Sequence, residues 1–359
     1  MNNINKLLKI TVISLIIFGL VMIFSSSYIW AEYKYNNPYK YVISQSIFFF
    51  MGLIIMNILS KIDYKVYLKY SNIILLICFI LLVLVLIPGI GQIRNGSRSW
   101  FSLFGLGFQP SEISKIGLII FTSKYLSKNK KMMNNFFDGV VPIMLVIILF
   151  FLLILMEPDF GTGMVIVLTL FVMLFVSKTK LSFFLKVGIA GLVGIVVLIL
   201  IAPYRLDRIV SFLNPWSDPL GSGFQIIQSL YAIGPGGLLG MGFKKSIQKY
   251  FYLPEPQTDF IFSIISEELG FLGVLIVVSS FFIIFYLCMI IFFKTNDLFG
   301  KYLVFGLSFG IILQAILNLC VVVGLIPVTG VTLPFISYGG SSLLVSMTSI
   351  GIILNVGNK

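Results

Sequence analysis

Residues 270–293 read GFLGVLIVVSSFFIIFYLCMIIFF, an apolar run without a charged side chain. A helix rises about 1.5 Å per residue and the hydrocarbon core of a bilayer is about 30 Å thick, so this run can cross a membrane. Comparable runs recur along the whole chain. The sequence therefore predicts an all-α polytopic membrane protein with ten transmembrane helices, near residues 10–30, 42–59, 71–87, 112–127, 140–156, 162–177, 181–202, 270–293, 302–323 and 333–355.

Composition supports this fold class. Of the 359 residues, 58% are hydrophobic and only 11% are charged, too few to cover the surface of a soluble protein of this size. The first apolar run lacks the small-residue cleavage site of a secretory signal, and nine more runs follow it. We therefore expect it to remain as a membrane anchor.

The basic residues predict the orientation of the chain in the cytoplasmic membrane. If both termini are cytoplasmic, fifteen of the 25 lysines and arginines fall on the inner side, as the positive-inside rule expects. A net charge of +12 could suggest nucleic acid, but the lysines stand singly or in small groups beside spans. Such residues set topology and meet anionic lipid headgroups. We expect no nucleic-acid partner.

The chain contains no histidine, and its three cysteines, Cys78, Cys288 and Cys320, lie within apolar spans. The commonest general base and metal ligand is therefore absent, and no metal or disulfide spacing is present. Any acid–base chemistry must use Asp, Glu, Lys or Tyr.

Two outer segments stand apart from the short loops that join most spans. The first covers residues 88–111 and the second residues 203–269, which is far longer than a connection needs. Long loops are usually functional or disordered. Disorder is disfavoured for the second, because its many aromatic residues would prefer packing or the membrane interface.

An acidic stretch ends the second outer segment. Residues 254–262 read PEPQTDFIF, and Glu267 and Glu268 follow. Asp259 follows Thr258 and precedes the apolar residues 260–262 just before a span, and partial desolvation there would make it a better proton acceptor. The alternative is that Asp259 only caps a helix that starts at Phe260, with the two glutamates marking a break.

Two further acidic motifs lie at outer ends of spans. Glu112 and Lys115 are three residues apart, so they share a helix face and form either a neutralised pair inside a cavity or a structural ion pair. Glu157 and Asp159 form another outer turn, which could instead be a hydrated turn that begins the next helix.

Basic residues of the outer segments suit an anionic substrate, particularly a pyrophosphate, because guanidinium groups bind phosphate oxygens bidentately. They include Arg94, Arg98 and Arg205, and the alternative is that they are scattered interface residues. No glycine-rich segment matches a Walker loop or a dinucleotide fingerprint, which disfavours nucleotides. The segment 327–342, PVTGVTLPFISYGGSS, either packs tightly against helices or lines a polar cavity with hydroxyls such as that of Ser337.

Taken together and in this order, the motifs resemble the SEDS family of polytopic cell-wall enzymes, which includes FtsW, RodA and SpoVE. The resemblance spans nearly the full chain and rests on NGSRSW at 95–100, QPSEISK at 109–115, EPDFGT at 157–162, Gln228-Ser229 with residues 232–234, the stretch 254–270 and the stretch 327–342. FSSSY at 24–28, FLNPW at 212–216 and QKYFYLPE at 248–255 favour the FtsW/SpoVE branch.

This resemblance implies a single ten-span membrane domain over residues 1–359, with 203–269 as its large outer loop. It also implies peptidoglycan glycosyltransferase activity on lipid II at the outer face of the membrane, for division or sporulation. The family aspartate matches Asp259. One departure is Gln257, where the family commonly has histidine, so Asp259 is expected to act alone or through water.

The expected reaction follows from the resemblance. Asp259 would accept the proton of the acceptor's N-acetylglucosamine 4-hydroxyl as that oxygen attacks C1 of the donor's N-acetylmuramic acid, with inversion. Positioned cations would stabilise the polyprenyl pyrophosphate that leaves, with or without a divalent metal ion, and no residue is assigned as a metal ligand. The expected substrate-binding residues are Arg94, Arg98, Glu112, Lys115, Glu157, Asp159, Arg205, Gln257 and Ser337.

Three alternatives remain at this point: a lipid II flippase, a RodA-type elongation polymerase, and a structural partner of the division machinery without activity. The resemblance also implies protein partners, namely a class B penicillin-binding transpeptidase and other divisome membrane proteins.

Overall fold

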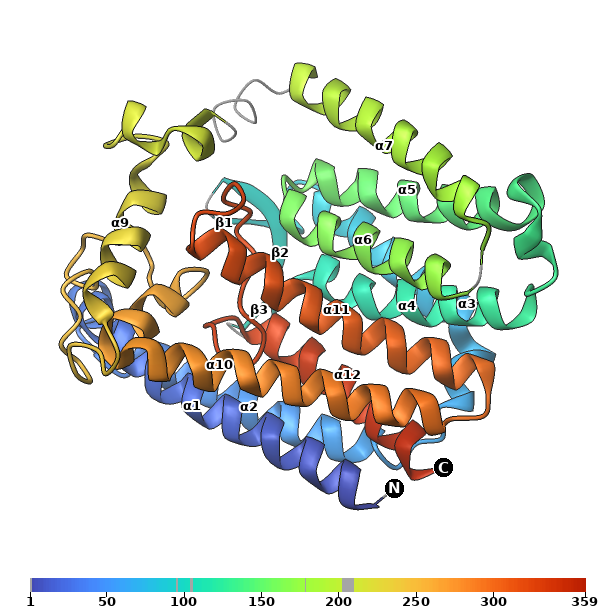
Figure 1. Ribbon diagram of the computed structural model, residues 1–359, viewed down its shortest axis with the longest axis horizontal. Helices are drawn as coiled ribbons and strands as arrows, with labels where there is room; N and C mark the ends of the chain where they lie inside the picture. The colour runs from blue at the N-terminus through green and yellow to red at the C-terminus, as the bar shows by residue number, and fades with distance from the viewer. Residues whose placement is uncertain (1, 95, 104–105, 178, 202–209) are drawn as a thin grey trace.

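The computed structural model describes residues 2–94, 96–103, 106–177, 179–201 and 210–359. Each predicted span coincides with a helix of one elongated bundle (Figure 1). These helices are α1 (Asn2–Tyr35), α2 (Lys40–Leu59), α3 (Lys65–Leu86), α4 (Pro110–Lys128), α5 (Val141–Met156), α6 (Phe160–Val176), α7 (Leu181–Ile201), α10 (Ile261–Lys294), α11 (Leu298–Val322) and α12 (Gly340–Asn358).

Seven stretches of described helix are long and apolar enough to cross a membrane, and the shorter α6 is also apolar. Large apolar side chains stay exposed along α2, α3 and α10, which is the surface that a lipid environment requires. Among the seven, α12 is the most enclosed by other helices. The prediction of an all-α polytopic membrane protein is confirmed.

Several helix boundaries differ from those expected, and two of them bear on the site. α10 begins at Ile261 rather than near 270, and Glu267 and Glu268 lie inside it. The backbone break comes later, at Gly270, whose φ of 62° and ψ of −153° are not helical. α12 begins at Gly340 rather than near 333, because Pro334 and the positive φ of Phe335 keep the preceding segment out of helical conformation.

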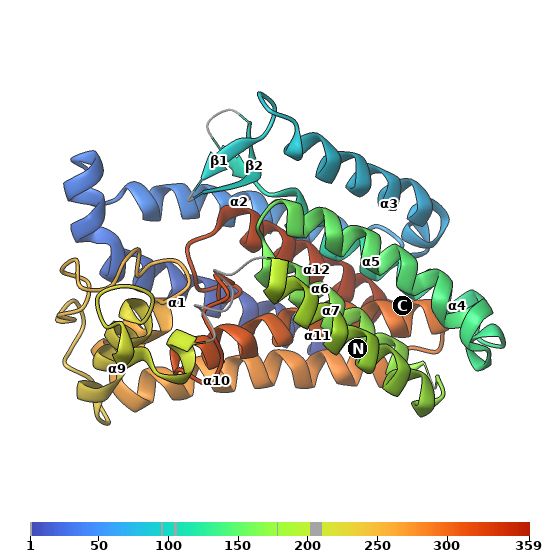
Figure 2. The ribbon, with the colours of Figure 1, turned by 90° about the horizontal axis from the view of Figure 1, so that it is seen from above.

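The first outer segment contains strands that the sequence analysis did not predict. β1 (Gln92–Arg94), β2 (Ser97–Leu103) and β3 (Leu106–Phe108) form a small antiparallel sheet in that order. Ile93 pairs with Arg98, and Ser102 pairs with Gly107. Figure 2 shows this sheet beside the end of α3 from which the chain enters it.

The second outer segment folds into short helices and turns that pack against the bundle end. It contains η3 (Pro215–Ser217), α9 (Phe224–Ile233) and η4 (Gly234–Gly236). The connection from α4 to α5 holds η1 (Met132–Asn134) and η2 (Phe136–Val140). Because α10 starts at Ile261, the described loop ends nine residues earlier than the predicted limit of 269.

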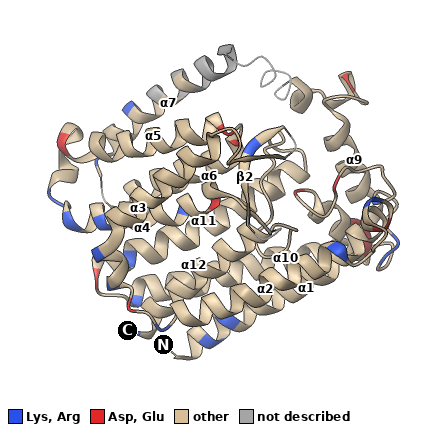
Figure 3. Cartoon of the chain, turned by 180° about the vertical axis from the view of Figure 1, so that it is seen from behind, with Lys and Arg blue, Asp and Glu red and all other residues tan. Residues whose placement is uncertain are grey.

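Both chain termini lie at the end of the bundle opposite the sheet and the large loop (Figure 1). Asn5 of α1 connects them, since its amide donates to the Leu354 carbonyl at 3.1 Å and to the Asn358 side chain at 2.6 Å. Figure 3 shows lysines and arginines gathered at the end with the termini, while the middle of the bundle carries few charged residues.

Candidate active site

Asp259 lies directly before α10, on a turn whose next residues, Phe260 and Ile261, are fully buried. The Thr258 hydroxyl lies 3.0 Å from Asp259 Oδ1 and 2.7 Å from the Glu255 carbonyl. One hydroxyl proton serves one acceptor fully at a time, so Thr258 can switch between them. The helix cap is Phe260, one residue later than the capping alternative expected.

The backbone that carries Asp259 is fixed to the segment before α12. The side-chain amide of Asn318 in α11 donates to the Asp259 carbonyl at 2.7 Å and to the Val331 carbonyl at 2.7 Å. Tyr338 N–H donates to the Gln257 carbonyl at 2.8 Å. The acidic loop and the 327–342 segment therefore meet and form one polar wall at the end of the bundle opposite the termini.

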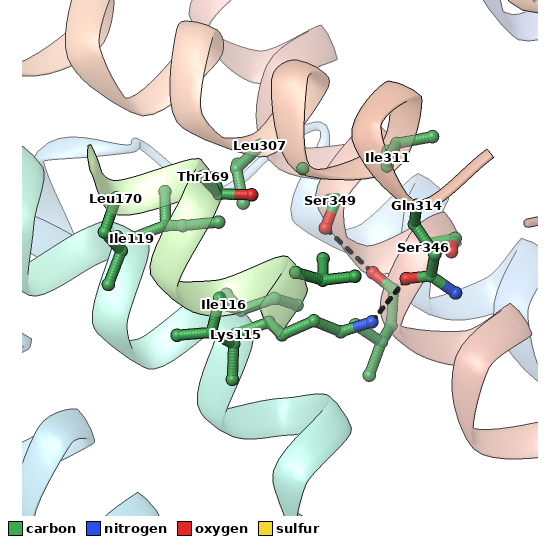
Figure 4. Close-up of a pocket in the computed structure, with 14 residues that line it drawn as sticks. Lys115, Ile116, Ile119, Thr169, Leu170, Leu307, Ile311, Gln314, Ser346 and Ser349 are labelled. Atoms are coloured by element: carbon green, nitrogen blue, oxygen red, sulfur yellow. Dashed lines mark hydrogen bonds between the residues drawn. The ribbon is translucent and has the colours of Figure 1, made fainter. Parts of the chain in front are cut away.

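Lys115 is the centre of a second polar network (Figure 4). Its ammonium lies 2.8 Å from Glu112 Oε2 and donates to Gln314 Oε1 at 2.6 Å. Gln314 in turn donates to the Thr332 carbonyl at 3.0 Å and to the Ser342 hydroxyl at 3.3 Å. The predicted Glu112–Lys115 pair is thus present, and it reaches α11 and the start of α12.

Gln314 and Asn318 connect the two networks. They are four residues apart on α11, so their side chains lie on one helix face, and they bond the carbonyls of the adjacent residues Thr332 and Val331. Neither residue was predicted from the sequence. The available signal was two amides at i and i+4 within an apolar span, where polar side chains are uncommon.

Asp159 joins the N-terminal ends of three helices. It caps α6, where its Oδ1 accepts from Thr162 N–H at 3.1 Å, and its Oδ2 accepts from Gln109 at 2.7 Å and from Ser111 at 3.1 Å. Gln109 N–H donates to the Ser341 hydroxyl of α12 at 3.1 Å. The N-termini of α4, α6 and α12 therefore converge here, and their dipoles make this end favourable for an anion.

Glu157 is fully buried next to this junction, and neither carboxylate oxygen has a hydrogen-bond partner among the described residues. Burial, followed by the nearby charge of Asp159, raises the pKa of Glu157 to about 9. The side chain is therefore protonated at neutral pH. Ser97 of β2 donates to the Glu157 carbonyl, which holds the sheet over this turn.

The predicted basic residues differ in what the structure describes of them. Arg98 extends toward the last turn of α3, with its guanidinium 3.5 Å from the Leu86 carbonyl. Arg94 ends β1, and its side chain lies outside the described part of the structure. Arg205 lies outside the described residues. Arg98 and Lys115 are the predicted basic residues whose side chains the structure describes. Of these two, Lys115 contacts the polar wall, through Gln314.

Gln257 and Ser337 both lie against that wall. Gln257 is buried, and its side-chain oxygen has no partner among the described residues. Ser337 Oγ accepts from Leu333 N–H at 2.9 Å, and its carbonyl accepts from Gln45 of α2 at 3.2 Å. Ser337 therefore shapes the turn that positions Tyr338 beside Gln257.

Glu267 and Glu268 hold the large loop against α10. Glu267 accepts from the Ser246 hydroxyl and from Ile247 N–H, and Glu268 forms a fully buried ion pair with Lys249 at 2.6 Å. Ser25 of α1 donates to the other oxygen of Glu268. These contacts assign the two glutamates a structural role.

The loop also repairs the backbone break in α10. Met241 and Gly242 N–H groups donate to the carbonyls of Glu267 and Glu268, while the carbonyls of Gly237 and Leu238 accept from Phe271 and Leu272 N–H. Four backbone groups that the break would orphan are satisfied. Gly240 and Gly270 have positive φ. A Cβ on Gly240 would clash with the backbone of α10, and a Cβ on Gly270 would clash with the backbone of the loop.

A cavity between α4, α6, α11 and α12 extends from the Lys115 network toward the bundle centre. Its walls are mostly apolar, with Thr169, Ser346 and Ser349 as polar exceptions (Figure 4). Among the described residues, no three His, Cys, Asp or Glu side chains gather as a metal site would require. The site as described therefore offers carboxylates, amides and one paired ammonium for chemistry.

The sequence of the chain is similar to those of known proteins. The sequence model of the FTSW_RODA_SPOVE family, described as cell cycle protein, matches residues 5–359. The chain is 48% identical to stage V sporulation protein E of Bacillus subtilis (strain 168), over 98% of this chain and 96% of that protein. It is 39% identical to a probable peptidoglycan glycosyltransferase FtsW of Geobacter sp. (strain M18), over 95% and 93% of the two chains.

Two solved structures have a similar fold. A chain from a peptidoglycan synthase complex, described as coordinating polymerisation and crosslinking, superposes with a TM-score of 0.80 at 30% identity, over 98% of this chain and 96% of that one. The rod shape determining protein RodA of Thermus thermophilus superposes with a TM-score of 0.72 at 26% identity, over 98% and 95%.

Proposed function

Because the chain belongs to the FtsW/RodA/SpoVE family, we propose that it is a peptidoglycan glycosyltransferase that polymerises lipid II in cell division or sporulation. The relatives named SpoVE and FtsW agree with the branch that the sequence motifs favoured. A polymerase of this kind needs a proton acceptor, a site for a pyrophosphate leaving group and access for lipid tails.

The observation that carries this proposal is the fixed position of Asp259. Its carbonyl is held by Asn318, its carboxylate lies beside the Thr258 hydroxyl, and the next two residues are buried at the start of α10. A general base works best when its geometry is set before substrate arrives. Gln257 cannot replace a histidine as a proton relay, so Asp259 receives the proton directly or through water.

The reaction is a displacement at C1 of the donor's N-acetylmuramic acid. The 4-hydroxyl oxygen of the acceptor's N-acetylglucosamine forms the new C1–O bond and loses its proton to Asp259. The bond from C1 to the pyrophosphate oxygen breaks, and its electron pair leaves with the polyprenyl pyrophosphate. Attack from the opposite face converts the α linkage into a β linkage.

Negative charge grows on the pyrophosphate in this step. The converging N-termini of α4, α6 and α12 offer backbone dipoles for it, and Lys115 offers a cation already held by Glu112 and Gln314. Arg94, Arg98 and Arg205 are proposed as further cations from the two outer segments. A divalent ion bound by the pyrophosphate itself would add to this charge stabilisation.

The orientation and partners belong to the same proposal. Both termini face the cytoplasm, where the lysine-rich end lies, and the large loop faces outward. A related chain is part of a peptidoglycan synthase complex in which polymerisation and crosslinking are coordinated. We therefore propose a class B penicillin-binding transpeptidase as partner, with other membrane proteins of the division machinery.

The test is reconstitution of the purified chain in liposomes that carry lipid II in one leaflet only, with and without a class B transpeptidase partner. Glycan polymer on gels is the expected result. Leaflet exchange without polymer would make the protein a flippase, and neither activity in the presence of the partner would make it a structural component. Either of those results overturns the proposal.

A further inference from the structure

A second cavity lies between α3 and α4, away from the candidate active site. Its volume is about 220 Å³, and it is lined by Asn72 of α3 together with Phe121, Lys124, Tyr125, Lys128 and Asn129. α4 ends at Lys128, so the cavity opens near the end of the bundle that carries the termini. None of these residues takes part in the proposed reaction.

The cavity is basic and lacks a matching acid. Lys124 and Lys128 are four residues apart, so two like charges share one helix face. Lys124 donates one hydrogen bond to Asn72 Oδ1 at 2.9 Å, which leaves the ammonium two further donors. Among the described lining residues there is no Asp or Glu.

Asp138 contacts the cavity through its backbone, but its carboxylate bonds to another partner. The Tyr125 hydroxyl donates to the backbone carbonyls of Asp138 at 3.3 Å and Gly139 at 2.9 Å. The carboxylate of Asp138 accepts from the side chain of Asn135. The two lysines of the cavity therefore remain without a carboxylate partner in the described structure.

The position matches the boundary between lipid headgroups and acyl chains. α3 begins at Lys65, beside α12, where Tyr64 N–H donates to Asn355 at 2.9 Å. Asn72 is seven residues further, about 10 Å along the helix. Lys65 and Lys69 precede it on the same side of α3 and add positive charge toward the bundle end.

Apolar surface continues from the cavity in the opposite direction. Ile73 and Leu76, the next residues of α3 toward the membrane centre, are 54% and 57% exposed. A ligand that fills the cavity with an anionic group and lies along these side chains must be amphipathic. Basic pockets between transmembrane helices on the cytoplasmic side bind anionic lipid headgroups.

We propose that this cavity binds the phosphate headgroup of one anionic phospholipid of the cytoplasmic leaflet. Lys124 and Lys128 contact the phosphodiester oxygens, and Asn72 and Asn129 bond the polar remainder of the headgroup. The acyl chains lie against Ile73 and Leu76. The site is separate from Asp259, so its test is independent of the polymerase assignment.

The first experiment measures lipid retention on the full chain by native mass spectrometry, with phosphatidylglycerol against phosphatidylcholine as the probes. The Lys124→Gln/Lys128→Gln variant is compared with Lys130→Gln/Lys131→Gln, which loses the same charge from exposed positions outside the cavity. We expect binding of one phosphatidylglycerol to weaken roughly tenfold or more in the first variant, because the phosphodiester loses two charge-assisted hydrogen bonds. The control variant should stay within about twofold of the wild type, because Lys130 and Lys131 lie outside the cavity and make no hydrogen bond to the bound headgroup.

A single substitution at Asn72 tests the cavity without changing its charge. Asn72→Leu fills the space beside Lys124 and should lower phosphatidylglycerol retention while both lysines remain. Three results would overturn the site. They are an equal loss of phosphatidylglycerol in the two double variants, retention of phosphatidylcholine by the wild type equal to that of phosphatidylglycerol, and unchanged phosphatidylglycerol binding in Asn72→Leu. Soluble glycerophosphate that competes at the affinity of the lipid would show a free-phosphate site instead and would also overturn the proposal.

Discussion

The side chain of Asn318 holds the backbone carbonyl of Asp259 at 2.7 Å, and its second amide proton holds the Val331 carbonyl at the same distance. One buried amide near the C-terminal end of α11 thus sets the distance between the proposed base and the segment that leads into α12. This relationship makes Asn318 a positioning residue.

Asn318→Ala should lower the rate of glycan polymerisation by about tenfold to a hundredfold, because loss of a hydrogen bond leaves a buried carbonyl unpaired at a cost of about 1–3 kcal/mol. The lipid II concentration for half-maximal rate should change less than the rate. Ser308→Ala is the matched control, since Ser308 is also buried in α11 and bonds only the Phe305 carbonyl in the described contacts. Equal rates for both variants would remove the positioning role.

The Glu112–Lys115 pair should behave as a coupled unit. Breaking a buried ion pair from one side typically costs about 3–5 kcal/mol, whereas replacing both partners costs much less. Their side chains are only 7% and 12% exposed. We expect Lys115→Met to lower the thermal melting temperature in detergent more than the double variant Glu112→Leu/Lys115→Met does. Additive losses would show that the two charges are not coupled.

The loop contact that repairs α10 depends on Gly240 and Gly270. A side chain at either position meets backbone of the opposite segment and occupies a positive φ, so alanine is strained there. Gly240→Ala and Gly270→Ala should each destabilise the protein by several kcal/mol and expose the large loop to protease. Gly188→Ala in α7 is the control: an added Cβ meets no other atom there, so this variant should leave proteolysis unchanged.

Glu157 predicts a pH dependence of stability. An unfolded carboxyl titrates near about 4.3. Burial raises the pKa of Glu157 to about 9 in the folded protein. Between these values the folded state holds a proton that the unfolded state has lost, so stability falls as pH rises, by at most about 1.4 kcal/mol per unit.

Glu157→Gln should remove this slope, which melting temperatures from pH 5 to 8.5 would measure. Glu32→Gln, at an exposed position on α1, should keep the wild-type slope. Parallel slopes in wild type and Glu157→Gln would mean that Glu157 is ionised in the folded protein.

The sequence was informative where one residue pattern determines one structure. Apolar runs located the ten long helices of the bundle, and the i, i+3 spacing of Glu112 and Lys115 predicted a pair that is present. Boundaries were wrong where tertiary contacts override local composition. The first turns of α10 contain Glu267 and Glu268 and are helical because a distant loop satisfies both carboxylates.

The site was only partly predictable for the same reason. Asp259, Gln257 and Ser337 stood out by their motifs, but the amides that bring them together, Gln314 and Asn318, are single polar residues in an apolar helix. The strands at 92–108 were also missed, because three short strands give little periodic signal. Contacts between segments that are distant in sequence leave no local pattern.

The central claim is that Asp259 accepts the proton during polymerisation. The most direct measurement is the single-turnover rate of lipid II polymerisation for Asp259→Asn and Asp259→Glu beside Glu32→Gln, with each variant reconstituted with the proposed class B transpeptidase. The account predicts a loss of about a hundredfold or more for asparagine, partial recovery for glutamate, and wild-type rates for the Glu32 control. A wild-type polymerisation rate for Asp259→Asn in correctly inserted protein would contradict it.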